Sequence, residues 1–141
     1  MIFHDFKKNK LFLVRTSGAG CKSKSVLMLF DFEKETTLKE LSAVPLSLRK
    51  PPSIQQSSSL KEILSNVSID ETLSLLANLA HKAWLKDYHP HIENLNLTLS
   101  SLAEKANHFS RVYGLEEIPT LKGKLVAMLK LKEVKGIRYQ S

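Results

Sequence analysis

Apolar residues recur along residues 68–88 with the spacing of an α-helix. One continuous stripe, at alternating steps of four and three, is formed by Ile69, Leu73, Leu76, Ala80 and Ala83. Three further leucines, at positions 75, 79 and 85, lie off that stripe, and a helix wetted on one side would not need them. Pro90 ends the pattern, because proline disfavours helical geometry in the residue before it and has no N–H group. We therefore predict a central helix over 68–88.

The start of this central helix has the pattern of a capping box. Ser68 stands three residues before Glu71, so its hydroxyl can accept from the backbone N–H of Glu71 while the carboxylate reaches back to the N–H of Ser68. Asp70 and Glu71 also suit the positive end of the helix dipole. The pattern predicts Ser68 as the N-cap.

A second apolar seam follows the corner His89-Pro90-His91. It recurs at steps of three and four through Ile92, Leu95, Leu99, Leu102, Ala106, Phe109 and Tyr113. Gly114 suits the left-handed conformation that ends many helices. We predict a third helix over about 91–113. Because the corner is short, it would lie antiparallel to the central helix in a hairpin about 30 Å long.

The chain before residue 59 differs in pattern. Two short runs rich in aromatic and β-branched residues, Lys10–Arg15 and Ser25–Glu33, flank a turn-forming segment and predict a β-hairpin with a long basic loop. One or two helical turns are expected over Thr36–Ser42, with Leu38 and Leu41 facing inward. Residues 43–58 are rich in proline, serine and glutamine and predict an extended linker.

The remaining segments complete the predicted fold. A short helix begins at Ser59, and Leu121–Lys135 fits a fourth helix, although Leu129–Lys132 alternates like a strand. Ile137–Tyr139 is read as a tail or as a strand that pairs with the N-terminal hairpin. The predicted class is α+β, with a β-hairpin region at 1–42, a linker at 43–58 and a three- to four-helix bundle with a long antiparallel helical hairpin at 59–141.

Charge is concentrated at the two ends of the chain. The chain of 141 residues has a net charge of +7. Residues 1–25 carry six basic side chains and one acidic side chain, and residues 120–141 also carry six basic and one acidic. The intervening segment is net acidic. Two basic ends would attract polyanions such as nucleic acid if the fold brought them together. The alternative is that the positive charge serves solubility.

Composition narrows the class of protein. There is no run of about 18 apolar residues, and His4 and Asp5 interrupt any apolar segment of a signal peptide. The single cysteine, Cys21, excludes an internal disulfide within this sequence and a multi-cysteine zinc site. We expect a cytoplasmic protein with no membrane association.

Motifs for catalysis or metal binding are weak. Gly18–Ser25 resembles a phosphate-binding loop, but Ser23 replaces its second glycine and a strand-like run follows it. The histidines at positions 81, 89, 91 and 108 lack the spacing of metal ligands. Cys21 lies beside lysines, which can lower a thiol pKa, yet no protease pattern surrounds it. We expect neither enzymatic activity nor a metal or cofactor.

The leading functional hypothesis is a non-enzymatic accessory protein that contacts the phosphate backbone of RNA or DNA with little sequence specificity. The predicted contact residues are Lys7, Lys8, Lys10, Arg15, Lys22, Lys24, Lys122, Lys124, Lys130, Lys132, Lys135, Arg138 and Tyr139, the tyrosine as a base-stacking residue. The alternative is a helical adaptor, chaperone or assembly subunit that docks a protein partner or a second copy through the apolar seam. Its predicted interface is Leu95, Leu97, Leu99, Leu102 and Phe109.

Overall fold

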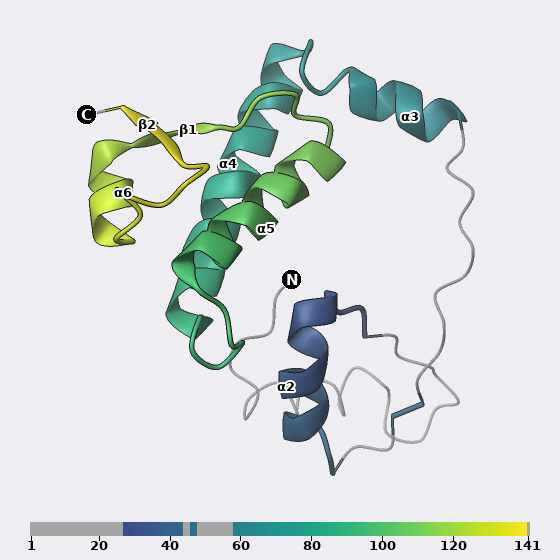
Figure 1. The fold of residues 1–141 in the computed structure, drawn as a ribbon. Helices are drawn as coiled ribbons and strands as arrows, with labels where there is room; N and C mark the ends of the chain where they lie inside the picture. Colours follow the sequence, from purple (N-terminus) through teal and green to yellow (C-terminus); the bar gives the residue numbers. More distant parts are fainter. Residues whose placement is uncertain (1–26, 44–45, 48–57, 141) are drawn as a thin grey trace. The chain divides into compact units, whose positions relative to one another are not determined.

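The computed structural model describes residues 27–43, 46–47 and 58–140. The chain divides into two compact units, Met1–Lys50 and Pro51–Ser141 (Figure 1). In the first unit, the 3-10 turn η1 (Asp31–Glu33) continues into the helix α2 (Lys34–Glu40). Thr37 and Leu41 are the buried residues of its described part. The predicted linker 43–58 falls mostly outside the described residues and stays a prediction.

The predicted N-terminal β-hairpin is wrong. Its first strand, Lys10–Arg15, lies outside the described residues, and its second is irregular at 27–30 and helical from Asp31 onwards. The acidic side chains explain the difference, because the Glu33 carboxylate accepts a hydrogen bond of 2.8 Å from the Phe30 N–H and closes a turn. The Phe30 and Phe32 rings stack on each other, with their centroids 5.4 Å apart.

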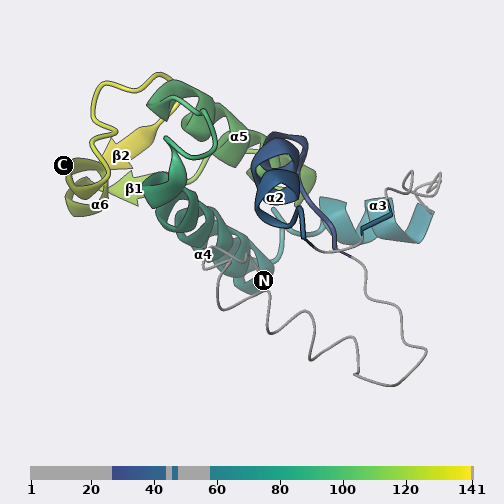
Figure 2. The ribbon, with the colours of Figure 1, turned by 90° about the horizontal axis from the view of Figure 1, so that it is seen from below.

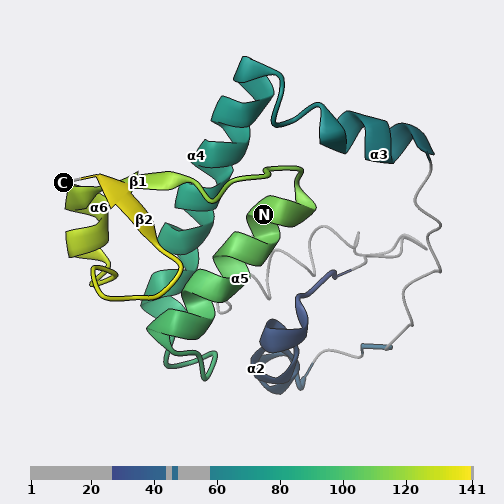
Figure 3. The ribbon, with the colours of Figure 1, turned by 45° about the horizontal axis from the view of Figure 1, so that its top comes forward.

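The second unit is built on two long helices. Along the chain come α3 (Ser58–Ser65), α4 (Glu71–Tyr88), the turn η2 (His89–His91) and α5 (Leu99–Val112). They are followed by β1 (Thr120–Lys122), α6 (Gly123–Met128) and β2 (Arg138–Gln140). Helices α4 and α5 pack side by side, and α3 projects away from the start of α4 (Figures 1 and 3). The described residues thus form five α-helices and a two-stranded parallel sheet, which replaces the predicted fold class.

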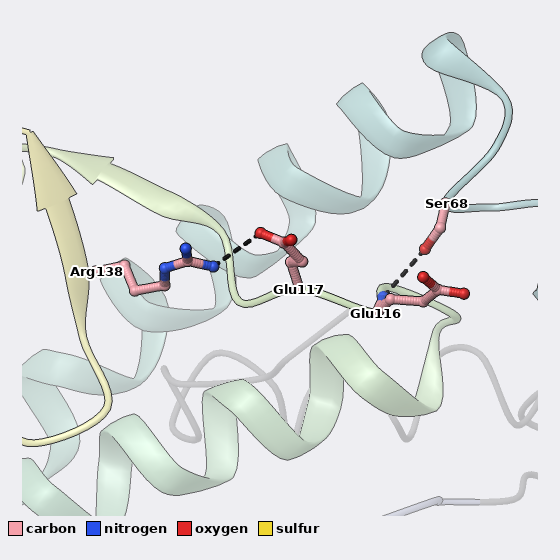
Figure 4. A network of polar contacts seen from close by, with 4 residues as sticks. All are labelled: Ser68, Glu116, Glu117 and Arg138. Carbon is pink, nitrogen blue, oxygen red and sulfur yellow. Dashed lines mark hydrogen bonds and ion pairs between the residues drawn. The ribbon is translucent and has the colours of Figure 1, made fainter.

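The N-terminus of α4 is capped by Asp70, and the predicted role of Ser68 is wrong. The Asp70 carboxylate accepts from the Leu73 N–H at 2.8 Å. Ser68 is engaged elsewhere, since its hydroxyl donates to the Gly114 carbonyl at 2.7 Å and accepts from the Glu116 N–H at 3.0 Å (Figure 4). The Ser68 side chain therefore forms a tertiary contact instead of the predicted cap, and α4 begins three residues later than predicted.

The helix α5 is shorter than the predicted helix over 91–113. The chain passes through η2 and a series of turns, with Asn96 at φ 52, before Thr98 caps α5 by accepting from the Ser101 N–H at 3.1 Å. Its end agrees with the prediction, because Gly114 adopts φ +88. A Cβ at Gly114 would collide with the Leu64 carbonyl, so glycine is also required by the close approach of the last turn of α3.

The core of the second unit lies between α4 and α5. It contains Trp84, Leu85 and Tyr88 from α4 and Leu102 and Ala106 from α5, all at most 4% exposed. The Trp84 ring lies 4.3 Å from the Tyr88 ring, with further aromatic contacts from α5. The C-terminal half of α4 therefore supplies its largest side chains to this core.

The segment after α5 does not form the predicted fourth helix over Leu121–Lys135. Leu121 lies in β1, α6 ends at Met128, and Lys130 adopts φ 53, which prevents the helix from continuing. Strand β2 pairs in parallel with β1, with Leu121 opposite Tyr139, and not with an N-terminal hairpin. Buried leucines and a valine, at positions 121, 126, 129 and 131, fill the small core of this lobe.

Candidate nucleic-acid interface

The segment from β1 to β2, residues 120–140, forms what we call the basic lobe. It lies on one side of the α4–α5 pair (Figures 1 and 2). His89 at the end of α4 donates from Nε2 to the Leu129 carbonyl at 3.0 Å, and Asn107 of α5 donates from Nδ2 to the Gly136 carbonyl at 2.9 Å. These two hydrogen bonds, together with the buried apolar residues, hold the lobe against the helical pair.

The cations of the basic lobe are all exposed. The set comprises Lys122, Lys124, Lys130, Lys132, Lys135 and Arg138. Glu133 is the acidic residue within the same range. Only Arg138 of these cations forms an ion pair with another described residue, at 2.8 Å from Glu117 in the segment after α5 (Figure 4). Five lysines thus remain in water on a short, anchored segment, which is the charge arrangement that phosphate groups attract.

The other predicted nucleic-acid contacts have different positions. Tyr139 lies in β2 and is 39% exposed, so part of its ring is accessible for stacking. The N-terminal members lie outside the described residues, as does the phosphate-loop-like segment Gly18–Ser25: Lys7, Lys8, Lys10, Arg15, Lys22 and Lys24. Whether the two basic ends form one surface therefore stays a prediction.

The predicted protein interface contributes in large part to the chain's own packing. Leu102 is fully buried, and Phe109 lies between the rings of Trp84 and Tyr113, at 5.9 and 4.5 Å. The remaining members are half-buried at the start of α5 and just before it: Leu95, Leu97 and Leu99. The larger exposed apolar surface is on α4 instead, at Leu75, Leu76 and Leu79.

His81 and Ser110 form a buried polar pair between α4 and α5. The His81 Nδ1 lies 2.6 Å from the Ser110 hydroxyl and 3.2 Å from the Ala106 carbonyl. Because a carbonyl only accepts, Nδ1 carries the proton, and the buried Nε2 has no partner among the described residues. Burial lowers the pKa of His81 below its ordinary value of 6.5, assisted by the charge of Lys82 and opposed by the hydrogen bond to Ala106.

This pair is structural, because His81 has no exposed surface and Ser110 is 2% exposed, so a substrate cannot reach either group. Among the described residues, no group of three or more histidine, cysteine, aspartate or glutamate side chains is placed to hold a metal ion. Within the same residues, no helix is long and apolar enough to cross a membrane.

Comparison with known proteins gives one informative similarity. The chain is 31% identical over 117 residues to DEAD-box ATP-dependent RNA helicase 48 of Oryza sativa subsp. japonica. The matched region covers 83% of this chain but only 14% of the helicase. No family model matches the sequence. No solved structure matches it.

Proposed function

We propose that this chain is a non-enzymatic RNA-binding module that holds the phosphate backbone on its basic lobe with little sequence specificity. The observation that carries the proposal is the set of five exposed lysines without ion pairs to described residues, on a lobe fixed by hydrogen bonds from His89 and Asn107. Lysine contacts of this kind neutralise phosphates and position a protein on a strand without reading bases.

The similarity to a protein named as an RNA helicase favours RNA over DNA as the ligand. The shared region is a small fraction of that protein, so the similarity supports a shared accessory segment and not transfer of the ATP-dependent activity in its name. The buried state of the His81–Ser110 pair agrees with a binding role, because the polar groups that resemble a catalytic pair are closed to solvent.

Fluorescence anisotropy with labelled single- and double-stranded RNA and DNA, across about 50 to 300 mM salt, tests the proposal. If all five lysines contact phosphates of single-stranded RNA, log affinity should fall with log salt with a slope of about −3.5. The Lys130→Glu/Lys132→Glu variant should bind more weakly and lower the magnitude of that slope by about 1.4. Circular dichroism would establish that the variant is folded.

The matched control is Lys34→Glu/Lys39→Glu, which changes net charge equally at two exposed positions of α2. It should retain more of the affinity than the lobe variant does. Equal loss in both variants would mean that net charge, and not the basic lobe, is responsible. Absence of RNA binding at about 50 mM salt would overturn the proposal outright.

A second candidate function is an adaptor that docks through apolar helix surface. The specific observation in its favour is the exposure of Leu75, Leu76 and Leu79, each more than half exposed on α4. Monomeric soluble proteins rarely expose several large apolar side chains together, and such a patch often marks a binding surface.

A further inference from the structure

The described part of the second unit contains three turns of the same kind. In each turn, one residue with a positive φ donates from its N–H to the carbonyl three residues earlier, and the next residue donates to the carbonyl five residues before itself. These two hydrogen bonds define the Schellman motif. The residues with positive φ are Asn96 at 52, Gly114 at +88 and Lys130 at 53. One backbone conformation is therefore formed by three very different residue types.

Lys130 is the exception among these three residues. Glycine has no Cβ and enters the left-handed region without cost, and the short polar side chain of asparagine tolerates it. Lysine has no such property, because its Cβ crowds the carbonyl that follows. A cation just after a helix C-terminus is favoured by the helix dipole, but that gain is smaller than the cost of a left-handed lysine. The turn at position 130 therefore favours glycine over lysine.

The core of the basic lobe prevents this turn from relaxing. Leu129 is 4% exposed and Leu131 has no exposed surface, so the residues on both sides of Lys130 are fixed by burial. His89 adds a third restraint, because its Nε2 donates to the Leu129 carbonyl at 3.0 Å. A left-handed residue persists where the surrounding structure fixes it in this way, and such residues cluster at sites that bind ligands.

The Lys130 ammonium is the group that this turn can offer to a ligand. The N–H groups of Lys130 and Leu131 are bound to the carbonyls of Ala127 and Val126, at 3.2 and 2.9 Å, so the backbone has no free donor there. The Lys130 side chain is exposed and forms no ion pair with another described residue. Lys132, also exposed, stands on the other side of Leu131. The turn thus presents two lysines from a fixed backbone.

From this conflict between residue type and backbone conformation, we infer that Lys130 is the anchoring contact of the basic lobe. Its ammonium donates directly to one backbone phosphate of the RNA, and the fold is less stable because lysine occupies this turn. The inference rests on the proposed RNA binding and adds a rank order among the five lysines. A lysine that served only net charge would need no strained position.

Urea denaturation of the full chain, followed by Trp84 fluorescence, tests the cost to the fold. Lys130→Gly should raise the midpoint by about 0.5 M, because glycine adopts the left-handed turn without strain. Lys130→Gln removes the charge but keeps a Cβ in the turn, so its midpoint should not rise. A midpoint that is unchanged or lower in Lys130→Gly would show that lysine suits the turn, and would overturn the inference.

Fluorescence anisotropy with labelled single-stranded oligouridylate, at about 50 mM salt, tests the contact. Lys130→Gly and Lys130→Gln should each weaken binding about tenfold, the loss expected for a hydrogen bond between charged groups. The matched control is Lys124→Gln, which removes one exposed charge from the same lobe and should weaken binding less than about fivefold. Equal losses at the two positions would show that the lysines are interchangeable. That result would overturn the inference and leave the proposed function standing.

Asn96→Gly controls for the turn itself. Asn96 is exposed between η2 and α5, outside the basic lobe, and has the same motif as Lys130. Its replacement by glycine should leave RNA affinity unchanged. A tenfold loss in this variant would assign the effect to the backbone of the turns instead of the Lys130 charge, and would overturn the inference.

The combined result expected for Lys130→Gly is a more stable protein that binds RNA more weakly. Misfolding cannot produce this combination, because a misfolded variant would not have a raised midpoint. If the original chain does not bind oligouridylate at about 50 mM salt, the proposed function and the inference fail together. If the original chain binds and Lys130→Gly is stabilised without loss of affinity, the inference alone fails.

Discussion

In α5, the stripe that includes Leu99, Leu102 and Ala106 packs into the core, with Leu102 and Ala106 having no exposed surface. In α4, the stripe that includes Leu73 and Leu76 has the same spacing, and these two leucines are at least 40% exposed. Heptad spacing therefore indicates that a helix has a contact surface, but it does not indicate which neighbour covers that surface. In α4, the covered stripe is the more polar of the two.

The largest effect is expected from breaking the buried stripe. Leu102→Ala removes a fully buried side chain from the contact of α5 with α4, and should lower the free energy of unfolding by about 2 to 5 kcal/mol. Urea denaturation monitored by Trp84 fluorescence measures this change. A loss of under about 1 kcal/mol would mean that the contact between the two helices is far looser than its burial indicates.

An intermediate effect is expected from pH, because the stripe that α4 buries contains His81. Burial lowers the folded-state pKa of His81 below 6.5, so the unfolded chain binds a proton that the folded chain does not. His81 should therefore leave stability unaffected above pH 6.5 and reduce it as pH falls below that value, by at most about 1.4 kcal/mol per pH unit.

Urea denaturation between pH 7.5 and 5 measures this loss. The His81→Gln variant, with a side chain that does not titrate, supplies the comparison, and its stability should fall less steeply in that range. Parallel slopes for the two proteins would show that other groups cause the pH dependence.

The smallest effect is expected at the exposed stripe. Leu76→Ala should change the free energy of unfolding, measured by urea denaturation, by less than about 0.5 kcal/mol, because the side chain is already 55% exposed. A loss as large as that of Leu102→Ala would show that Leu76 is buried within the monomer, and the contrast between the two helices would disappear.

Several element ends could be predicted because local chemistry determines them. Pro90 follows the end of α4 at Tyr88, and Gly114 at φ +88 follows the end of α5. The start of α4 is predicted wrongly at Ser68, because Ser68 and Asp70 are both capable caps and only the contact of Ser68 with Gly114 and Glu116 decides between them. The local sequence around Ser68 does not show that residues more than 40 positions away will bind its hydroxyl.

Other features required knowledge of the packed structure. The strands β1 and β2 are three residues each and pair across an intervening helix, whereas the visible alternation at Leu129–Lys132 forms a turn. The exposure of the lobe lysines at positions 122 and 130 agrees with their predicted role as contacts, but their arrangement depends on hydrogen bonds from His89 and Asn107. The exposed leucines of α4 are absent from the predicted interface, because the sequence analysis places the docking surface on the apolar seam that follows Pro90.

The Ser68 hydroxyl has a consequence for the order of folding. Its two hydrogen bonds join positions 46 and 48 residues apart, and the whole of α4 and α5 lies between them. Closing so long a loop is entropically costly until the two helices have paired, so this contact forms late. Removing it should therefore accelerate unfolding and leave the refolding rate nearly unchanged. Ser68 is therefore expected to slow the unfolding of the helical pair, although it lies outside both helices.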